Sequence, residues 1–372
     1  MIVVAKPGLL ASVQDLGRHG HRQRGICPGG ALDALALSLA NRLVGNREDA
    51  AGIELTMGGC ALRFETATRI ALTGGDFGAR LDGVPLFPNW SVPVAAGQTL
   101  TLAGAPANDR SLRTWLAVAG GIDVPVVLAS RSTDLKAGFG GFQGRALKKG
   151  DRLPLGPTSL DAAQRARRAF GLRGPEWDIA RASRTLQSDS LFGPDGDAGG
   201  LGDAIALRVM PGPEFHQFTP EAQAAWFGAS WRITPQSNRM GSRLEAVDSG
   251  LSLQRTHQAD MLSSGVIPGT VQVPPSGQPI ILMGDAQTTG GYPRIGVVIR
   301  ADLWKLAQAP LGGLLRMVRV DTAAALAAWG AQQRYLAQVL QGLKSSGWPV
   351  AAAPVAQPAA EPPSIEGATH AD

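Results

Sequence analysis

Residues 265–296 read GVIPGTVQVPPSGQPIILMGDAQTTGGYPRIG, and this stretch indicates the fold more clearly than any other part of the chain. Residues 270–273 alternate polar and apolar side chains, which is typical of a strand with one buried face. Two prolines and a glycine within 274–277 predict a turn, because proline lacks the backbone donor that a strand interior needs. The apolar run 280–283 predicts a buried strand. We therefore expect a strand–turn–strand unit in a β-rich fold.

The segment that follows this strand, residues 284–294, is rich in groups that form hydrogen bonds. An acid, an amide, a phenol and a guanidinium come from Asp285, Gln287, Tyr292 and Arg294. Polar loops at strand ends commonly bind ligands. We expect a ligand here, and a solvated turn is the alternative.

The composition favours a globular, β-rich protein with two or three domains. The 372 residues include 48 glycines and 26 prolines, which are scattered between short apolar runs. Such punctuation favours short strands and tight turns over long helices. Hydrophobic residues make up 44% and charged residues 17%, as expected for a chain that buries a core.

Several functional classes are disfavoured. The net charge is +5, but no dense basic run interleaves with aromatic residues, so we expect no nucleic-acid partner. No apolar run reaches the roughly 18 residues of a membrane span. The N-terminus is too short for a signal segment, and Cys27 and Cys60 predict buried thiols in a reducing cytoplasm. The histidines lack zinc spacing, so we expect no metal, and no phosphate-binding lysine loop is present.

The order of the predicted elements divides the chain into five parts. We expect a first β-barrel domain at 1–156, a connector at 157–203 and a second β-barrel domain at 204–320. An amphipathic C-terminal helix is predicted at 321–344. The Ala/Pro-rich tail, 345–372, is expected to be disordered.

The two halves share a faint internal repeat. A strand that ends in Pro-Gly is predicted before residues 7–8 and 211–212, and an Arg-x-Gly-x-Arg pattern occurs at 18–22 and 239–243. Further pairs follow in the same order, which predicts two related barrels that arose by duplication. Equivalent loops of facing domains can converge on one cleft.

Two further segments have open interpretations. Asp33 begins a predicted helix, where an acid either complements the helix dipole or takes part in catalysis. The glycine-rich segment 138–145 does not match the dinucleotide-binding fingerprint. It is either a flexible lid or a loop that contacts substrate.

Four motifs together resemble the biotin-dependent carboxyltransferase family. This family includes the C component of bacterial 5-oxoprolinase, the KipA protein and the allophanate hydrolase subunit 2 region of urea carboxylase. The resemblance covers about residues 1–325 and implies two cyclophilin-like β-barrel domains. The motifs are QDLGR at 14–18 through GALD at 30–33, SRSTD at 130–134, NRMGSRLE at 238–245, and the stretch 269–296.

The resemblance implies one component of an amide (lactam) hydrolase, inactive alone. Acting with partner subunits A and B (KipI-like), it would cleave 5-oxoproline to glutamate with ATP. ATP would be supplied through the complex, and no cofactor is expected on this chain. The alternatives are the carboxyltransferase component of a biotin-dependent urea carboxylase, and a non-enzymatic KipA-type antagonist of a kinase inhibitor. The absence of a biotinyl-lysine context favours the first.

The candidate site residues occupy glycine-rich loops in both halves and would line a cleft between the barrels. Arginines would hold a substrate carboxylate, and acids would orient donors or move a proton. Two positions depart from the family pattern, with Gly29 in place of a serine and Ser242 in place of an aromatic residue. The expected catalytic residues are Asp285, Asp33 and Tyr292. The expected substrate-binding residues are Asp15, Arg18, Arg239, Arg243, Gln287, Thr288 and Arg294.

Overall fold

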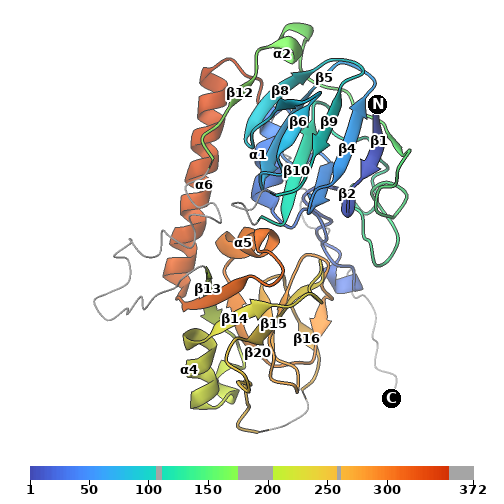
Figure 1. Cartoon of the computed structure of the whole chain (residues 1–372). Coiled ribbons are helices and arrows are strands. Elements are labelled where there is room, and N and C mark those ends of the chain that lie inside the picture. Colours follow the sequence, from blue (N-terminus) through green and yellow to red (C-terminus); the bar gives the residue numbers. More distant parts are fainter. Residues whose placement is uncertain (106–110, 175–203, 258–260, 352–372) are drawn as a thin grey trace, which may run out of the picture.

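The computed structural model describes residues 1–105, 111–174, 204–257 and 261–351. Figure 1 shows two β-rich parts, one above the other, with the long helix α6 (Thr322–Ser345) running along one side of both. Most of the predicted connector, residues 175–203, and most of the predicted tail, residues 352–372, lie outside the described residues. The mainly β class with some helix is confirmed.

The upper part contains two six-stranded sheets whose neighbouring strands are all antiparallel. Apolar side chains of both sheets, among them Val4, Leu62, Ile53 and Leu116, form one core. The first sheet has the order β11 (Arg152–Leu153), β1 (Ile2–Pro7), β4 (Cys60–Phe64), β9 (Thr99–Leu102), β6 (Ala79–Leu81), β7 (Val84–Pro85). The second has the order β12 (Phe170–Gly171), β8 (Trp90–Val94), β5 (Thr68–Gly74), β10 (Arg113–Val118), β3 (Gly52–Thr56), β2 (Leu10–Gln14).

The lower part is a closed seven-stranded barrel. All neighbouring strands are antiparallel except β13 and β21, which close the barrel in parallel. The predicted strands around 270–273 and 280–283 pair as β17 and β18. The order is β13 (Ile205–Pro211), β20 (Arg294–Val298), β17 (Thr270–Gln272), β18 (Ile280–Leu282), β15 (Gly241–Ala246), β14 (Ser230–Ile233), β21 (Leu314–Arg319), and β16 (Ser264–Gly265) pairs with β19 (Thr289–Gly290) alongside.

Closure therefore differs between the halves. The predicted barrel is present in the second half, whereas the first half forms two open sheets. The chain passes from one sheet to the other between β1 and β2, through Gly8 with a φ of +73°. A backbone turned this sharply places consecutive strands in different layers, and the two layers share a core instead of joining edge to edge.

The helices connect the layers. Helix α1 (Ala34–Leu43) packs on the second sheet, and its Leu39 and Leu43 share a cluster with Val339 and Leu343 of α6. Trp348 belongs to the same cluster and is 2% exposed, so the predicted tail begins with packed residues. The other helices within the described residues are α2 (Ala162–Ala166), α4 (Pro220–Gly228), α5 (Leu303–Gln308), and the 3₁₀ turns η1 (Arg22–Arg24), η2 (Phe215–Gln217) and η3 (Arg300–Asp302).

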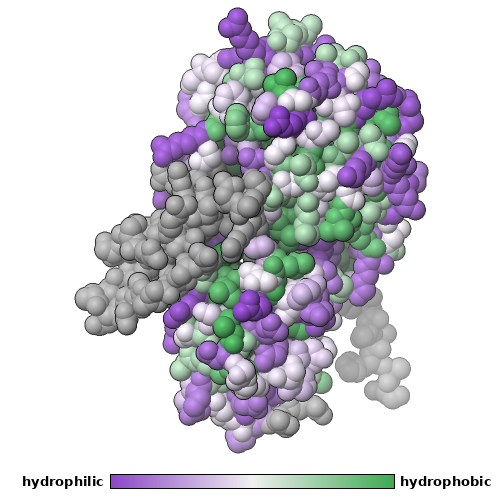
Figure 2. Space-filling model, viewed as in Figure 1, coloured by the Kyte–Doolittle hydropathy of each residue, from purple (hydrophilic) through white to green (hydrophobic). Residues whose placement is uncertain are grey.

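The two parts are in direct contact. Figure 2 shows that apolar residues gather near their junction on this face. Leu37 of α1 and Trp115 of β10 belong to the same buried cluster as Trp226 and Leu306 of the lower part. A shared apolar core fixes the loops of both parts relative to each other. Among the described residues, none of the helices combines the length and apolar character needed to cross a bilayer.

The barrel core yields a stability prediction. Trp226 is fully buried, and its ring centroid lies 5.5 Å from that of Trp231. We expect Trp226→Ala to lower the free energy of unfolding by about 3–5 kcal/mol, because it removes a large apolar side chain and leaves a cavity. Leu326→Ala, at a 65% exposed site on α6, is expected to change it by less than about 0.5 kcal/mol. Urea unfolding of both variants checks this, and equal effects would contradict the assigned core.

Candidate functional site

One guanidinium joins the two parts of the molecule. Arg239, in the loop before β15, donates from Nη1 to Oε1 of Glu54 in β3 at 2.6 Å. Its Nη2 donates to the Gly30 carbonyl at 2.6 Å. The same side chain holds Asp285 through two further bonds, of 2.8 Å from Nε and 3.0 Å from Nη2. Arg239 is only 6% exposed, so these contacts form a buried polar link between the halves.

Burial and opposite charges set the protonation of this cluster. Burial disfavours the charge on Arg239, but the carboxylates of Glu54 and Asp285 outweigh it and raise the pKa of the guanidinium. Burial raises the pKa of the Asp285 carboxyl, and Arg239 opposes that shift. Burial lowers the pKa of Arg113, whose Nε lies 3.5 Å from Glu54. The cluster thus balances two cations against two acids inside the protein.

Asp15 connects two loops of the upper part through hydrogen bonds. Its Oδ1 accepts hydrogen bonds from the hydroxyls of Ser130 and Ser132 and from the Gly17 N–H. Its Oδ2 accepts the Arg131 N–H. All of these donors belong to the upper part, so the described hydrogen bonds of the Asp15 carboxylate lie within that part. The geometry gives Asp15 the role of holding the loop around Ser132 against the loop that contains Arg18.

Arg18 is fully buried and incompletely paired. Its Nη2 donates to the Ser132 carbonyl, and its guanidinium carbon lies 4.6 Å from the centroid of the Phe139 ring. Within the described residues, Nε and Nη1 have no hydrogen-bond partner. A methyl group built on Gly29 would lie 3.3 Å from Nη1 of Arg18 and 3.7 Å from Oδ1 of Asp285. The structure therefore brings Arg18, Asp285 and, through it, Arg239 together around one point.

Cys27 lies beside the same point. Its Sγ is 3.4 Å from Oδ2 of Asp134. Burial, followed by the negative charges of Asp134 and Asp285, raises the pKa of the thiol to about 11, and Arg18 acts in the opposite direction. The thiol is protonated at neutral pH, which is unsuitable for a nucleophile.

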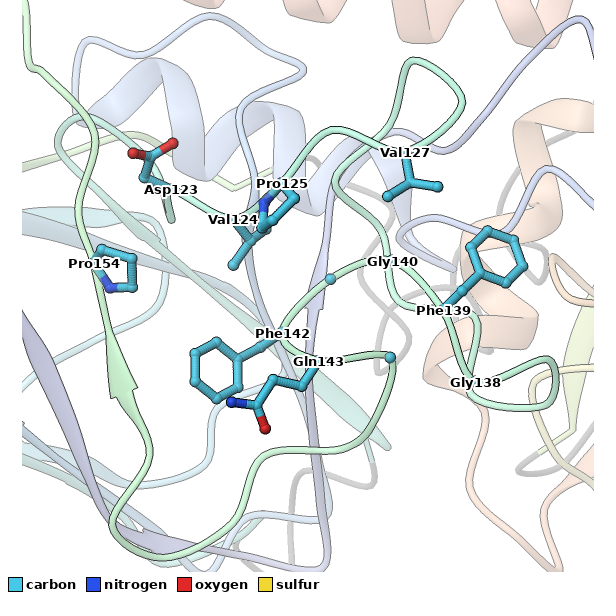
Figure 3. A pocket seen from close by; sticks show the side chains of 12 residues that line it. Asp123, Val124, Pro125, Val127, Gly138, Phe139, Gly140, Phe142, Gln143 and Pro154 are labelled. Atoms are coloured by element: carbon cyan, nitrogen blue, oxygen red, sulfur yellow. The ribbon is translucent and has the colours of Figure 1, made fainter.

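A cavity of about 420 Å³ lies beside the glycine-rich loop. Two loops, 123–127 and 138–144, and Pro154 line it (Figure 3). In this view Phe142 and Pro154 lie toward one end of the cavity and Phe139 lies at the other. Phe139 also contacts Arg18, so the glycine-rich loop separates the cavity from the buried guanidinium.

Asp33 caps helix α1. Its Oδ1 accepts a hydrogen bond from the Ala36 N–H at 2.9 Å. Its Oδ2 accepts a hydrogen bond from Nε2 of Gln308 in α5 at 3.1 Å. Burial raises the pKa of this carboxyl to about 6, although its hydrogen bonds oppose the shift. Of the two open interpretations, this geometry favours the helix-end role.

Two barrel candidates form their contacts elsewhere. Arg294 makes a paired salt bridge with Glu214 at 2.7 and 2.6 Å and donates to the Gly265 carbonyl. Gln287 donates to Gln272 at 3.3 Å. All of these partners belong to the lower part. The described hydrogen bonds and ion pairs do not join either residue to Arg18.

The remaining barrel candidates are also separate from that cluster in their contacts. Tyr292 is 47% exposed, and Arg243 lies on the exposed side of β15. Thr288 is buried, and its carbonyl accepts the Val266 N–H at 3.0 Å. The sequence-predicted set therefore splits into a junction group and a barrel group.

Sequence reasoning missed Glu54, Arg113 and Phe139. Glu54 offered a signal, because an acid inside the apolar strand 52–56 requires a buried partner. Arg113 and Phe139 offered none, since their partners are distant in sequence. Ser130 and Ser132 belong to the SRSTD motif, but nothing local in the sequence indicates their shared acceptor, Asp15.

The shifted pKa of Asp33 predicts a pH dependence of stability. The carboxyl titrates near pH 6 when folded and near 3.8 when unfolded, so the native state retains the proton longer. Stability contributed by the protonated form is therefore lost as pH rises from about 4 to 6. We expect Asp33→Asn to remove about 2–3 kcal/mol of that decline. Urea unfolding of both proteins from pH 4 to 7 measures it, and parallel profiles would contradict the assignment.

Comparisons with known proteins agree on one family. The family described as "Carboxyltransferase domain, subdomain A and B" matches residues 24–319. The chain is 44% identical to the C component of the 5-oxoprolinase of Escherichia coli K12, over 91% of this chain and 97% of that protein. It is 37% identical to the corresponding 5-oxoprolinase component of Haemophilus influenzae, over 88% of this chain and 94% of that protein.

A solved structure shares the fold. The urea amidolyase of Kluyveromyces lactis superimposes with a TM-score of 0.73 at 28% identity, covering 90% of this chain. This chain spans 19% of that much longer protein. The expected family relationship is thus confirmed both in sequence and in structure: the chain belongs to the carboxyltransferase domain family, subdomains A and B.

Proposed function

We propose that this chain is the C component of an ATP-dependent 5-oxoprolinase, acting with subunits A and B to cleave 5-oxoproline to glutamate. One observation carries the proposal: the 44% identity to the Escherichia coli C component extends over 97% of that protein. The urea amidolyases of Lachancea kluyveri and Saccharomyces cerevisiae are 32% identical, and the chain spans only 17% and 16% of them.

The chemistry of the junction suits such a substrate. Arg18 and Asp285 offer a buried cationic donor and an anionic acceptor at one point. Donors fixed in a buried site can stabilise the negative charge that develops on an attacked amide oxygen. Arg239 positions Asp285, while Asp15 and Asp33 position the surrounding loops.

The barrel candidates have a separate part in the proposal. Tyr292, Gln287 and Arg243 are exposed and available to substrate or to a partner subunit. Arg294 and Thr288 support the loop that presents them. ATP and subunits A and B complete the reaction in the cytoplasm. The two halves are proposed to be cyclophilin-like domains of common origin, joined through residues 157–203.

A second candidate is carboxyl transfer from biotin held on another chain. The superposition with the Kluyveromyces lactis urea carboxylase, with a TM-score of 0.73 over 90% of this chain, favours it. Retention of this chain by an immobilised biotinylated carrier protein, but not by the unmodified carrier, would support this function over lactam cleavage.

Reconstitution tests the leading function. We expect glutamate to form from 5-oxoproline only when this chain, subunits A and B and ATP are all present. Arg239→Lys is expected to lower kcat/KM at least about tenfold, because the ammonium cannot reproduce the paired bond to Asp285. Arg80→Ala, on the exposed face of β6, should leave the rate within about twofold.

Two outcomes would count against this function. Glutamate formation by subunits A and B without this chain would exclude it from the enzyme. Absence of glutamate from the full mixture, together with transfer of a carboxyl group from carboxybiotin on a carrier protein to an acceptor such as urea, would favour the second candidate instead.

A further inference from the structure

We propose that Arg18 and Asp285 form a recognition site for the amide edge of a small lactam, above the backbone of Gly29. The inference deepens the proposed function, on which it rests for the identity of the ligand. Arg18 would donate to the amide carbonyl, and Asp285 would accept the amide N–H. Gly29 would keep the space between them open.

The first observation is the incomplete pairing of Arg18. The side chain is fully buried, yet its Nε and Nη1 lack partners in the part of the chain that the structure describes. Leaving charged donors unpaired in a protein interior is costly, and native structures rarely do so without reason. A ligand that offers an acceptor to Nη1 satisfies this site.

The second observation is the position of Asp285. Its Oδ1 takes one hydrogen bond, from Nη2 of Arg239 at 3.0 Å, whereas a carboxylate oxygen can accept two. The point above Gly29 lies 3.7 Å from this oxygen and 3.3 Å from Nη1 of Arg18. A donor and an acceptor therefore face the same small volume from opposite halves of the protein.

This pairing matches one chemical group closely. In a small lactam the ring forces the carbonyl oxygen and the N–H to the same side, so both point in one direction. Urea presents the same edge. An extended secondary amide, like the peptide group, places them on opposite sides. A site with one donor beside one acceptor selects the first arrangement.

The local charge favours a neutral group over an isolated anion at this point. Asp134 and Asp285 both raise the pKa of the neighbouring Cys27 thiol, and Arg18 opposes them. Asp285 is already paired with Arg239, and Asp134 and Arg18 act on this thiol with opposite charges. The charges around the point therefore nearly balance, and a neutral amide needs no further counter-charge there. A carboxylate carried elsewhere on the ligand can point away from the pair.

Phe139 lies between the pair and the cavity beside the glycine-rich loop. Phe139 lines this cavity (Figure 3), and its ring centroid also lies 4.6 Å from the guanidinium carbon of Arg18. Movement of the Phe139 ring would open a path from this cavity to the guanidinium.

Equilibrium binding of two simple probes tests the inference. 2-Pyrrolidinone has the amide edge and no carboxylate, while N-methyl-2-pyrrolidinone keeps the ring and carbonyl but lacks the N–H. Ligand-detected NMR titration of the purified chain, and of its complex with subunits A and B, measures both affinities. We expect 2-pyrrolidinone to bind at least about tenfold more tightly, because the N-methyl probe leaves Asp285 without its donor.

Variants locate the binding point. Gly29→Ala places a methyl group between Arg18 and Asp285 and should weaken 2-pyrrolidinone at least about tenfold. Gly83→Ala is the matched control, since Gly83 also has a positive φ and a methyl group there meets nothing within 4 Å. It should leave affinity within about twofold. Arg18→Lys should weaken binding as Gly29→Ala does.

Each result separates this inference from the proposed function. Equal binding of the two probes, unchanged affinity in Gly29→Ala, or no binding of 2-pyrrolidinone to either chain or complex would overturn the amide site. If 5-oxoproline is nonetheless cleaved by the reconstituted enzyme, the proposed function stands. If the probes bind as expected and no cleavage occurs, the site stands and the function fails.

Discussion

The buried guanidinium of Arg239 is the charged contact between the two halves, which also share an apolar core. It connects Glu54 and Gly30 of the upper part to Asp285 of the lower part. Each partner alone would be a buried group without compensation, and the cost of that state is several kcal/mol. The junction is therefore specific, because any other relative placement of the halves would leave these charges unpaired. The consequence is that Asp285 is fixed where Arg18 also lies.

The two parts contribute different side chains and loops to the candidate site around this contact. The open sheets of the upper part supply Asp15, Arg18 and the glycine-rich loop, and they hold them through backbone-anchored hydroxyls. The closed barrel supplies Asp285 and Arg239 from adjacent loops, joined by the bond from the Asp285 N–H to the Arg239 carbonyl. A site built across a junction in this way has its two functional groups on separate rigid supports, which favours a small ligand held between them.

Much of this could be predicted from local sequence, and the remainder could not. The strands around 270–273 and 280–283 follow from side-chain alternation and a proline turn, and they pair as expected. Threonine is a residue type that favours helix N-termini, and the Thr219 side chain accepts the Ala222 N–H at the start of α4. That the first half forms two open sheets instead of a closed barrel was not predictable. Side-chain alternation identifies a strand, but it does not show which other strands it pairs with. The 185-residue separation between Arg239 and Glu54 likewise has no local signature. The resemblance supplied the family, but the division of candidates into a junction group and a barrel group emerged only from the contacts.

A double-mutant cycle between Glu54 and Arg239 tests the central claim most directly. The free energy of unfolding is measured for Glu54→Gln, Arg239→Met and the double variant. If the buried ion pair between Glu54 and Arg239 links the halves, the two effects are strongly coupled, and we expect an interaction energy of about 2 kcal/mol or more. Additive effects, within about 0.5 kcal/mol, would show that this ion pair does not link the halves and would contradict the account.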